Sequence, residues 1–366
     1  MIRRAAASEH NLALVEVIAS RVREAGSIGF DEFMRLALYH PEHGYYVACD
    51  PAFDYQTSPQ VHPVFGTMVA RQLSALWVSM DRPARFDVFE AGAGAGGLAV
   101  DVLMALREEE PALFEACRYA MQDVSLRDTA GRIEGAGVLD KAAFADELPG
   151  DASIEGCVLS NELLDALPFR RVRVERGVLH EVNVALEDER FVDRPVPAST
   201  EVRAYFDALG LLPGEGCDAE VNLEAVEWMH RAAASLRRGY VVTLDYGYAA
   251  SELYAPDRKR GTMLTFYRHM EGDDPYQRVG RQDITASVDF TSLRKAGAAA
   301  GLRTAYEAAQ AEWLVAMGLR EVVAQAGRNT DREALYALRR AAAALTDEAG
   351  LGRVRVLIQA KDGVGD

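Results

Sequence analysis

The feature that most constrains the fold of this chain is a glycine-rich run, AGAGAGG at residues 91–97, placed directly after Glu90. The preceding segment RFDVFE (85–90) predicts a short buried strand, and the residues from Leu98 to Glu109 have helical spacing. Glycine permits positive φ and lets the backbone approach a ligand closely. Ligands of open α/β sheets bind at the carboxyl ends of strands. A strand, a glycine turn and a helix in this order therefore predict a ligand site.

Strand candidates alternate with helices along much of the chain, which predicts an α/β fold with a parallel sheet covered by helices on both faces. The further strand candidates are Arg118–Asp123, Ile154–Ser160, Gly239–Gly247 and Arg353–Lys361. Helical spacing also marks residues 9–24, 31–40 and 64–80.

Two regions do not follow this alternation of strands and helices. Residues 169–197 alternate apolar and polar side chains, as in antiparallel hairpins, and residues 309–346 are alanine-rich and read as helices. We therefore expect a helical N-terminal segment, residues 1–84, that covers the cofactor. The main domain then spans 85–366, with hairpins at 169–220 and helices at 309–346 as insertions.

Composition excludes several classes of protein. The net charge of −16 argues against a nucleic-acid partner, which needs a clustered basic face. The four cysteines form no CxxC pair, so no metal site is expected. The first residues lack the apolar core of a signal peptide, and no apolar run reaches membrane-spanning length. These observations predict a cytoplasmic protein.

An acidic residue stands at the end of each of the first two predicted strands. Glu90 could hold the ammonium group of S-adenosylmethionine, and Asp123 could accept both ribose hydroxyls of a nucleoside. The glycines also fit G-x-G-x-x-G through Gly92, Gly94 and Gly97, so a nicotinamide enzyme remains an alternative. Asp123 does not separate the two, and it could instead be an acid at the start of a helix.

Three polar residues follow the predicted strand Ile154–Ser160. In SNELLDALP (160–168), Asn161, Glu162 and Asp165 come where a substrate or cofactor edge is expected. The alternative is helix capping by Ser160 or Asn161, with Glu162 in the first turn. Both roles are compatible.

These motifs together resemble the MidA-like methyltransferases, a family that includes a mitochondrial complex I assembly factor that methylates arginine. The resemblance rests on ALYHPEHGYY (37–46), FDYQTSPQVHPVFG (53–66), EAGAGAGGLA (90–99), SNELLDALP (160–168), LDYGY (244–248), RGTMLTFYRH (260–269) and DITASVDF (283–290). It implies a Rossmann-like, seven-stranded class I methyltransferase sheet and S-adenosylmethionine as donor. It also implies a protein arginine as acceptor, in a partner such as a respiratory complex I subunit; a homo-oligomer is possible.

The positions of these residues and the resemblance together indicate their roles. The expected cofactor-binding residues are Glu90, Gly92, Gly94, Gly96, Asp123, Asn161, Thr57 and Ser58. Because an arginine acceptor is always protonated, a carboxylate must orient it and help remove its proton. Glu162 is the first candidate for this catalytic role and Asp165 the second, while Asp289 is expected to cap a helix. The alternatives are a small-molecule methyltransferase, an NAD-dependent oxidoreductase, or an assembly factor that binds the donor without catalysis.

Overall fold

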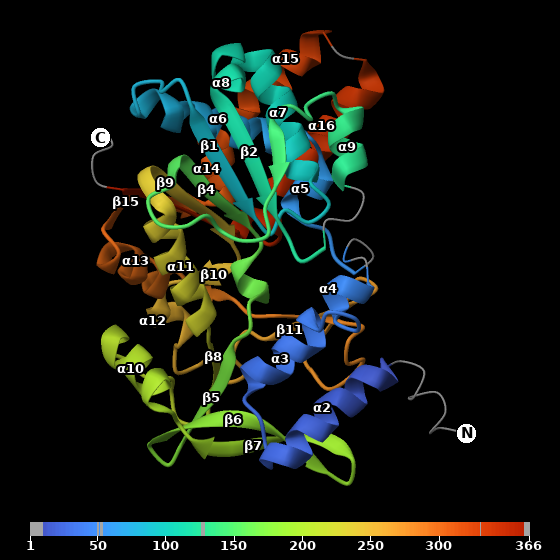
Figure 1. Ribbon diagram of the computed structural model, residues 1–366, viewed down its shortest axis with the longest axis vertical. Coiled ribbons are helices and arrows are strands. Elements are labelled where there is room, and N and C mark those ends of the chain that lie inside the picture. Colours follow the sequence, from blue (N-terminus) through green and yellow to red (C-terminus); the bar gives the residue numbers. More distant parts are fainter. Residues whose placement is uncertain (1–9, 50, 52–53, 126–128, 330, 362–366) are drawn as a thin grey trace. The chain divides into compact units, whose positions relative to one another are not determined.

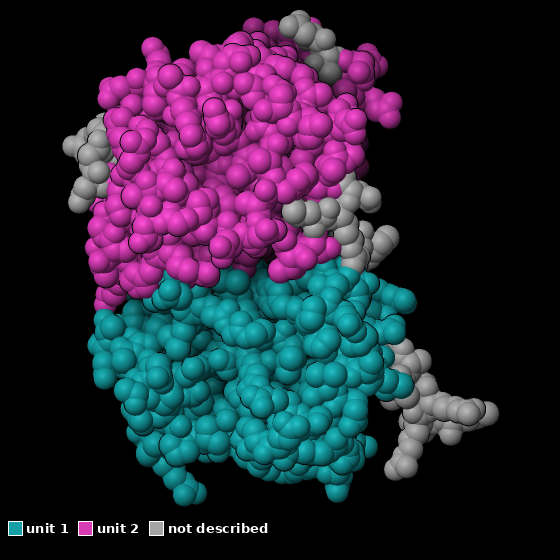
Figure 2. Space-filling view, viewed as in Figure 1, with its two compact units in different colours: residues 1–55, 164–227, 247–293 teal, residues 56–163, 228–246, 294–366 magenta. Residues whose placement is uncertain are grey.

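The structure is a computed structural model that describes residues 10–49, 51, 54–125, 129–329 and 331–361. Glu9 and Phe53, which belong to a predicted helix and a quoted motif, lie outside these residues. The chain divides into two compact units, coloured separately in Figure 2. Unit 1 comprises Met1–Tyr55, Leu164–Glu227 and Gly247–Leu293, and unit 2 comprises Gln56–Leu163, Trp228–Tyr246 and Arg294–Asp366.

Unit 2 contains a seven-stranded sheet of order β15-β16-β9-β4-β1-β2-β3 (Figure 1). Its strands are β1 (Phe86–Ala91), β2 (Cys117–Gln122), β3 (Ala142–Phe144), β4 (Ile154–Asn161), β9 (Leu236–Asp245), β15 (Leu302–Ala309) and β16 (Arg355–Lys361). Only β16 runs antiparallel to its neighbours, which are β9 and β15. The strand order reverses at β1, because β2 and β3 lie on one side of it and β4 and β9 on the other. This reversal is the place where open α/β sheets bind ligands.

The sheet confirms the predicted α/β class and seven strands. Five predicted strands appear, with each end within three residues of its predicted position. The sequence pattern does not predict β3 or β15. The strand β3 has three residues, and β15 lies at the sheet edge with mostly half-buried or exposed side chains.

The helices of unit 2 flank this sheet. They are α5 (Ser58–Val61), α6 (Val64–Ser79), α7 (Gly97–Glu109), α8 (Pro111–Ala116), α9 (Thr129–Gly135), α14 (Gln310–Ala316), α15 (Leu319–Asn329) and α16 (Arg332–Leu345), with a short 3-10 turn at Leu351–Arg353. Two further helices, α11 (Leu223–Ser235) and α13 (Phe290–Ala299), have residues in both units. The helical character predicted for residues 309–346 is confirmed.

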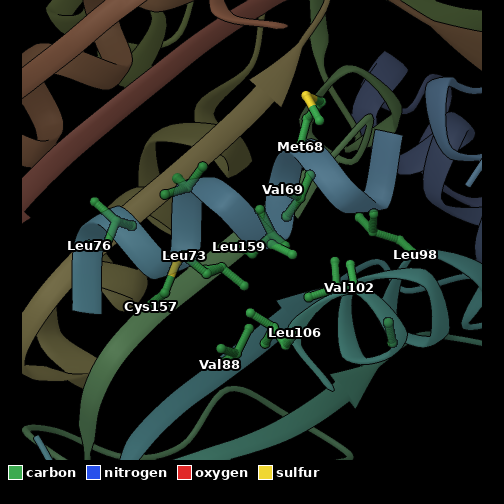
Figure 3. Close-up of a cluster of buried hydrophobic side chains, with 14 of the residues drawn as sticks. Met68, Val69, Leu73, Leu76, Val88, Leu98, Val102, Leu106, Cys157 and Leu159 are labelled. Atoms are coloured by element: carbon green, nitrogen blue, oxygen red, sulfur yellow. The ribbon is translucent and has the colours of Figure 1, made fainter. Parts of the chain in front are cut away.

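The main core of unit 2 lies between the sheet and helices α6 and α7. Met68, Val69, Leu73 and Leu76 recur on α6 at spacings of one, three and four residues, so they share one face. Figure 3 shows them next to side chains of β1, β4 and α7, and all are buried. This packing fixes the helix that follows the glycine turn against the strand that precedes it.

Unit 1 carries the antiparallel strands predicted between residues 169 and 197. Its four-stranded sheet has the order β7-β6-β5-β8 and comprises β5 (Arg170–Glu175), β6 (Val178–Glu187), β7 (Arg190–Pro197) and β8 (Asp218–Val221). A second sheet pairs β11 (Leu264–Tyr267) with β12 (Met270–Gly272) and β13 (Asp283–Thr285), and β10 (Gly247–Tyr248) pairs with β14 (Val288–Asp289). The helices are α2 (Leu12–Ala25), α3 (Phe30–Tyr39), α4 (Tyr45–Ala48), α10 (Thr200–Leu209) and α12 (Ala250–Leu253), with a 3-10 turn at Leu164–Ala166.

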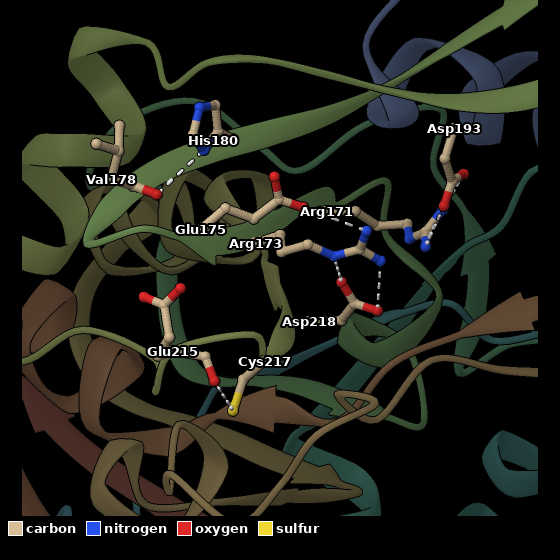
Figure 4. A network of polar contacts seen from close by, with 9 residues as sticks. All are labelled: Arg171, Arg173, Glu175, Val178, His180, Asp193, Glu215, Cys217 and Asp218. Carbon is tan, nitrogen blue, oxygen red and sulfur yellow. Dashed lines mark hydrogen bonds and ion pairs between the residues drawn. The ribbon is translucent and has the colours of Figure 1, made fainter.

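Ion pairs connect the strands of the larger sheet in unit 1 (Figure 4). Arg171 of β5 forms two hydrogen bonds with Asp193 of β7, at 2.7 and 2.9 Å. Arg173 pairs in the same way with Asp218 of β8, at 2.5 and 2.9 Å. Two-point pairing is geometrically specific, so these contacts support the strand register.

The two observed units do not match the predicted division of the chain into residues 1–84 and 85–366. The helices α2, α3 and α4 belong to unit 1, whereas α5 and α6 belong to unit 2. The predicted cofactor-covering role of residues 1–84 stays a prediction. Within the described ranges, no helix is both long and apolar enough to cross a membrane.

Candidate functional site

The predicted site residues gather at one edge of the unit 2 sheet, with one exception. Glu90 pairs with Leu159 and Met121 in the parallel register, so the ends of β1, β2 and β4 coincide. Glu90, the glycine turn, Asp123, Asn161, Glu162, Thr57 and Ser58 all belong to unit 2, whereas Asp165 belongs to unit 1.

The glycine turn needs glycine for backbone reasons. Gly92, Gly94 and Gly96 have φ values of 73°, 53° and 72°, a region that side chains disfavour. A Cβ atom on Gly96 would lie 2.4 Å from Thr129, but a Cβ atom on Gly94 would meet no protein atom within 4 Å. Gly96 is therefore needed for packing as well. Gly94 faces open space, as expected where the backbone approaches a ligand.

Glu90 is buried at the end of β1, with 2% of its surface exposed. Its Oε2 accepts a hydrogen bond from the Tyr119 hydroxyl at 2.8 Å. Burial raises the pKa of Glu90 to about 8, although the Tyr119 hydrogen bond opposes this shift. Contact between Glu90 and a ligand ammonium group stays a prediction.

Asp123 connects two loops. Its Oδ2 accepts the Gly94 N–H at 2.9 Å, and its Oδ1 accepts the Ser125 N–H at 2.9 Å. Burial raises the pKa of Asp123, while these two backbone donors lower it. Asp123 therefore fixes the glycine turn and its own turn, and it remains available to accept from a ribose because each carboxylate oxygen has two lone pairs.

Glu162 follows β4 with φ at 50°, an uncommon conformation for a residue other than glycine. Its N–H donates to the Leu244 carbonyl at 2.8 Å. Its Oε1 accepts the Ser58 N–H at 3.0 Å and the Asn161 amide at 3.4 Å. Removal from bulk water raises the pKa of Glu162 to about 7, against the effect of these donors. The carboxylate is thus held in a defined position and changes its charge near neutral pH.

Asp245 supports the Glu162 loop from the end of β9. Its two carboxylate oxygens accept the N–H groups of Leu163 and Tyr246, at 3.2 and 2.9 Å. The side chain is fully buried. These contacts give Asp245 a structural role in the Glu162 loop.

Thr57 and Ser58 begin the short helix α5. The Thr57 N–H donates to Gln60 Oε1 at 3.1 Å, so Gln60 caps this helix. The Ser58 hydroxyl donates to Gln310 Oε1 at 3.1 Å, and both side chains are fully buried. No sequence signal identified Gln310, which lies 252 residues from Ser58.

The remaining candidates lie in unit 1. The Asp165 carbonyl accepts the Ala286 N–H at 3.0 Å, and the side chain is half-buried in the 3-10 turn Leu164–Ala166. The structure does not place Asp165 with Glu162 in one unit. Asp289 accepts the Thr291 N–H at 2.8 Å at the start of α13, which agrees with the predicted capping role.

The sheet edge in unit 2 fits a polar ligand. Three buried side-chain oxygens, Asn161 Oδ1, Ser160 Oγ and Thr243 Oγ1, have no hydrogen-bond partner among the described residues. Ser160 and Thr243 are register partners on β4 and β9, next to the end of β1. Unsatisfied buried polar atoms are rare in proteins, and a bound ligand or water is one way to satisfy them. The open side of Gly94 adds room for it.

Comparisons with known proteins agree with this geometry. The model of a family described as S-adenosyl-L-methionine-dependent methyltransferases matches residues 68–308. A solved structure from Burkholderia thailandensis, bound to S-adenosyl-homocysteine, is 30% identical, with a TM-score of 0.88 over 97% of this chain and 93% of that one.

Curated relatives are also similar over most of their length. The protein arginine methyltransferase NDUFAF7 homolog of Drosophila melanogaster is 29% identical, over 77% of this chain and 69% of the relative. Protein arginine methyltransferase NDUFAF7 of Danio rerio is 24% identical, over 80% and 74%. The names of both relatives describe mitochondrial proteins.

These names contradict the predicted cytoplasmic location, which rested only on the absence of recognisable targeting features.

Proposed function

Because the chain belongs to the S-adenosylmethionine-dependent methyltransferase family that its residues 68–308 match, we propose that it methylates an arginine side chain of a protein, with Glu162 acting on the acceptor. The cofactor is S-adenosylmethionine. The nicotinamide alternative, which the glycine spacing left open, is therefore wrong.

One observation carries the proposal for Glu162. A half-buried carboxylate stands at the end of β4, beside the strand that leads into the glycine turn, and has no ion-pair partner among the described residues. A guanidinium group would supply the missing positive charge through paired hydrogen bonds. The names of the curated relatives support arginine as acceptor. A respiratory complex I subunit is the first partner to test, as the family resemblance implies.

Each residue of the site has a proposed task. S-adenosylmethionine supplies an activated methyl group when bound. The turn at Gly92, Gly94 and Gly96 gives the ligand close access to the backbone, while Glu90 and Asp123 accept hydrogen bonds from it. Asn161, Thr57 and Ser58 complete the cofactor edge.

On the acceptor side, the Glu162 carboxylate orients the guanidinium and takes a proton from the attacking nitrogen. Its pKa of about 7 leaves part of the population ionised at neutral pH, as a general base requires. Asp165 belongs to unit 1, and its catalytic role stays a prediction from the sequence.

The test of this function is a search for the modified residue. Protein extract from cells that lack the protein is incubated with purified enzyme and S-adenosylmethionine labelled in the methyl group, and labelled residues are located by mass spectrometry. We expect labelled arginine, which is absent when the enzyme is omitted. Label only on small molecules, or on another type of side chain, would reject the proposed acceptor.

Asp123→Ala should weaken S-adenosyl-homocysteine binding by roughly 1.5–3 kcal/mol, the range for a hydrogen bond to a charged group. The substitution removes the predicted ribose acceptor and also releases the Gly94 N–H. Calorimetric titration measures the change. An affinity within error of the wild type would show that Asp123 only caps the two loops.

Glu90→Gln should change how stability depends on pH. The folded pKa of Glu90 is raised from 4.5 to about 8, so the folded state binds this proton more tightly than the unfolded state does. The free energy of unfolding of the wild type therefore falls as the pH rises from 4.5 toward 8. We expect Glu90→Gln to gain on the order of 2–4 kcal/mol in unfolding free energy, relative to the wild type, between pH 4.5 and 8. Chemical denaturation at several pH values measures this. Parallel stability curves for the two proteins would contradict it.

A further inference from the structure

The environment of Glu162 extends through one hydroxyl group to a buried glutamine. Ser58 contacts Glu162 with its backbone N–H and Gln310 with its side-chain hydroxyl. Ser58 lies at the first position of α5, and Gln310 at the first position of α14. All three residues belong to unit 2.

The amide orientation of Gln310 is set by its neighbours. Its Nε2 donates to the carbonyl oxygens of Leu345 and Leu351, each at 3.1 Å. The opposite orientation would point the amide oxygen at two carbonyl oxygens and leave them without donors. Gln310 Oε1 must therefore face Ser58 as an acceptor, and the hydroxyl of Ser58 must donate to it.

A hydroxyl group has one proton to donate. We propose that Gln310 is a positioning residue that takes the hydroxyl proton of Ser58 and so withholds it from the Glu162 carboxylate. Glu162 then keeps the backbone N–H of Ser58, which holds it in place, without a second donor from the same residue. This inference rests on the proposed role of Glu162 and extends it.

The Ser58 hydroxyl is within reach of Glu162 as well as of Gln310. Burial raises the pKa of Glu162, while the Ser58 N–H, the Asn161 amide and the Ser58 hydroxyl lower it, with no charged side chain among the causes. The single hydroxyl proton can serve only one of the two acceptors, and the amide orientation of Gln310 directs it to Gln310. The elements around it carry titratable groups at Asp245 on β9, His62 after α5 and Glu312 on α14. Since hydrogen bonds from uncharged groups oppose burial here, one additional donor would shift the pKa measurably.

The test measures the Glu162 pKa without any acceptor or donor. Carbon-13 NMR of labelled glutamate carboxylates follows the titration, and Glu162→Gln assigns the signal. Gln310→Met keeps a similar volume but frees the Ser58 hydroxyl, so we expect the Glu162 pKa to fall by roughly one to two units. The double variant Gln310→Met with Ser58→Ala has no hydroxyl that could donate to Glu162, so the Glu162 pKa should return close to its wild-type value.

A merely structural role of Gln310 would not produce this recovery. A pKa that stays constant in folded Gln310→Met, or stays low in the double variant, would overturn the proposal. Gln72→Met is the matched control, because Gln72 is also a buried glutamine that accepts one hydrogen bond, from Trp313 at 2.9 Å. It should leave the Glu162 pKa unchanged.

Ser58→Ala alone keeps the inference testable if Gln310→Met does not fold. Its hydroxyl donates to Gln310, so its removal should change the Glu162 pKa by less than about 0.3 units, well below the effect of a lost charged hydrogen bond. A rise of one unit would show that the hydroxyl serves Glu162 instead. Because these measurements need no turnover, they stand even if Glu162→Gln proves fully active and the proposed catalytic role fails.

Discussion

Glu162→Gln should lower methyl transfer by about two orders of magnitude or more, near the scale of general acid–base contributions. The amide keeps the size of the side chain and one oxygen for the Ser58 N–H. It loses the negative charge that would orient a guanidinium and accept its proton. Cofactor affinity should change little, since the proposed contacts of Glu162 are with the acceptor.

The measurement combines turnover on an arginine-containing protein, affinity for S-adenosyl-homocysteine, and melting temperature on the same variant. Glu155→Gln is the control, because Glu155 is an acid on the same strand that pairs with Arg237 at the surface. It should retain normal turnover. Retained activity in Glu162→Gln, with only a small loss of stability, would assign Glu162 to the support of the loop.

Gly94→Val should remove detectable cofactor binding and leave the protein folded. Valine at a φ of 53° costs about 1–2 kcal/mol or more in backbone strain. A Cβ atom at this position meets no protein atom within 4 Å, so the valine side chain begins in the space in which we expect the ligand. Calorimetric titration and circular dichroism measure the two effects separately.

Gly210→Val provides a matched control for the strain. Gly210 follows α10 in unit 1 with φ at 72°, and a Cβ atom there also meets nothing within 4 Å. This variant should lose similar stability and keep its cofactor affinity. Equal affinities in both glycine variants would show that the turn at Gly94 is needed only for the backbone.

The strongest predictions from sequence came from local patterns. The strands β1, β4 and β9 contain runs of buried residues, and β2 alternates buried with more exposed side chains, which is why all four could be placed from the residues alone. Because parallel strands share one carboxyl edge, Glu90, Asp123 and Glu162 could be assigned to that edge as well. Family motifs then added the cofactor and the seven-stranded sheet, which the family match and the sheet confirm.

Tertiary structure alone decided the rest. The strand β15 has the composition of a helix and becomes a strand by pairing with β16. Asp165 is only three residues from Glu162, yet the chain passes from one compact unit to the other between them. Gln310 is distant in sequence and meets Ser58 only because α14 and α5 are brought together. Sequence patterns report the periodicity and the ends of elements, whereas hydrogen bonds between distant side chains depend on packing that no local pattern encodes.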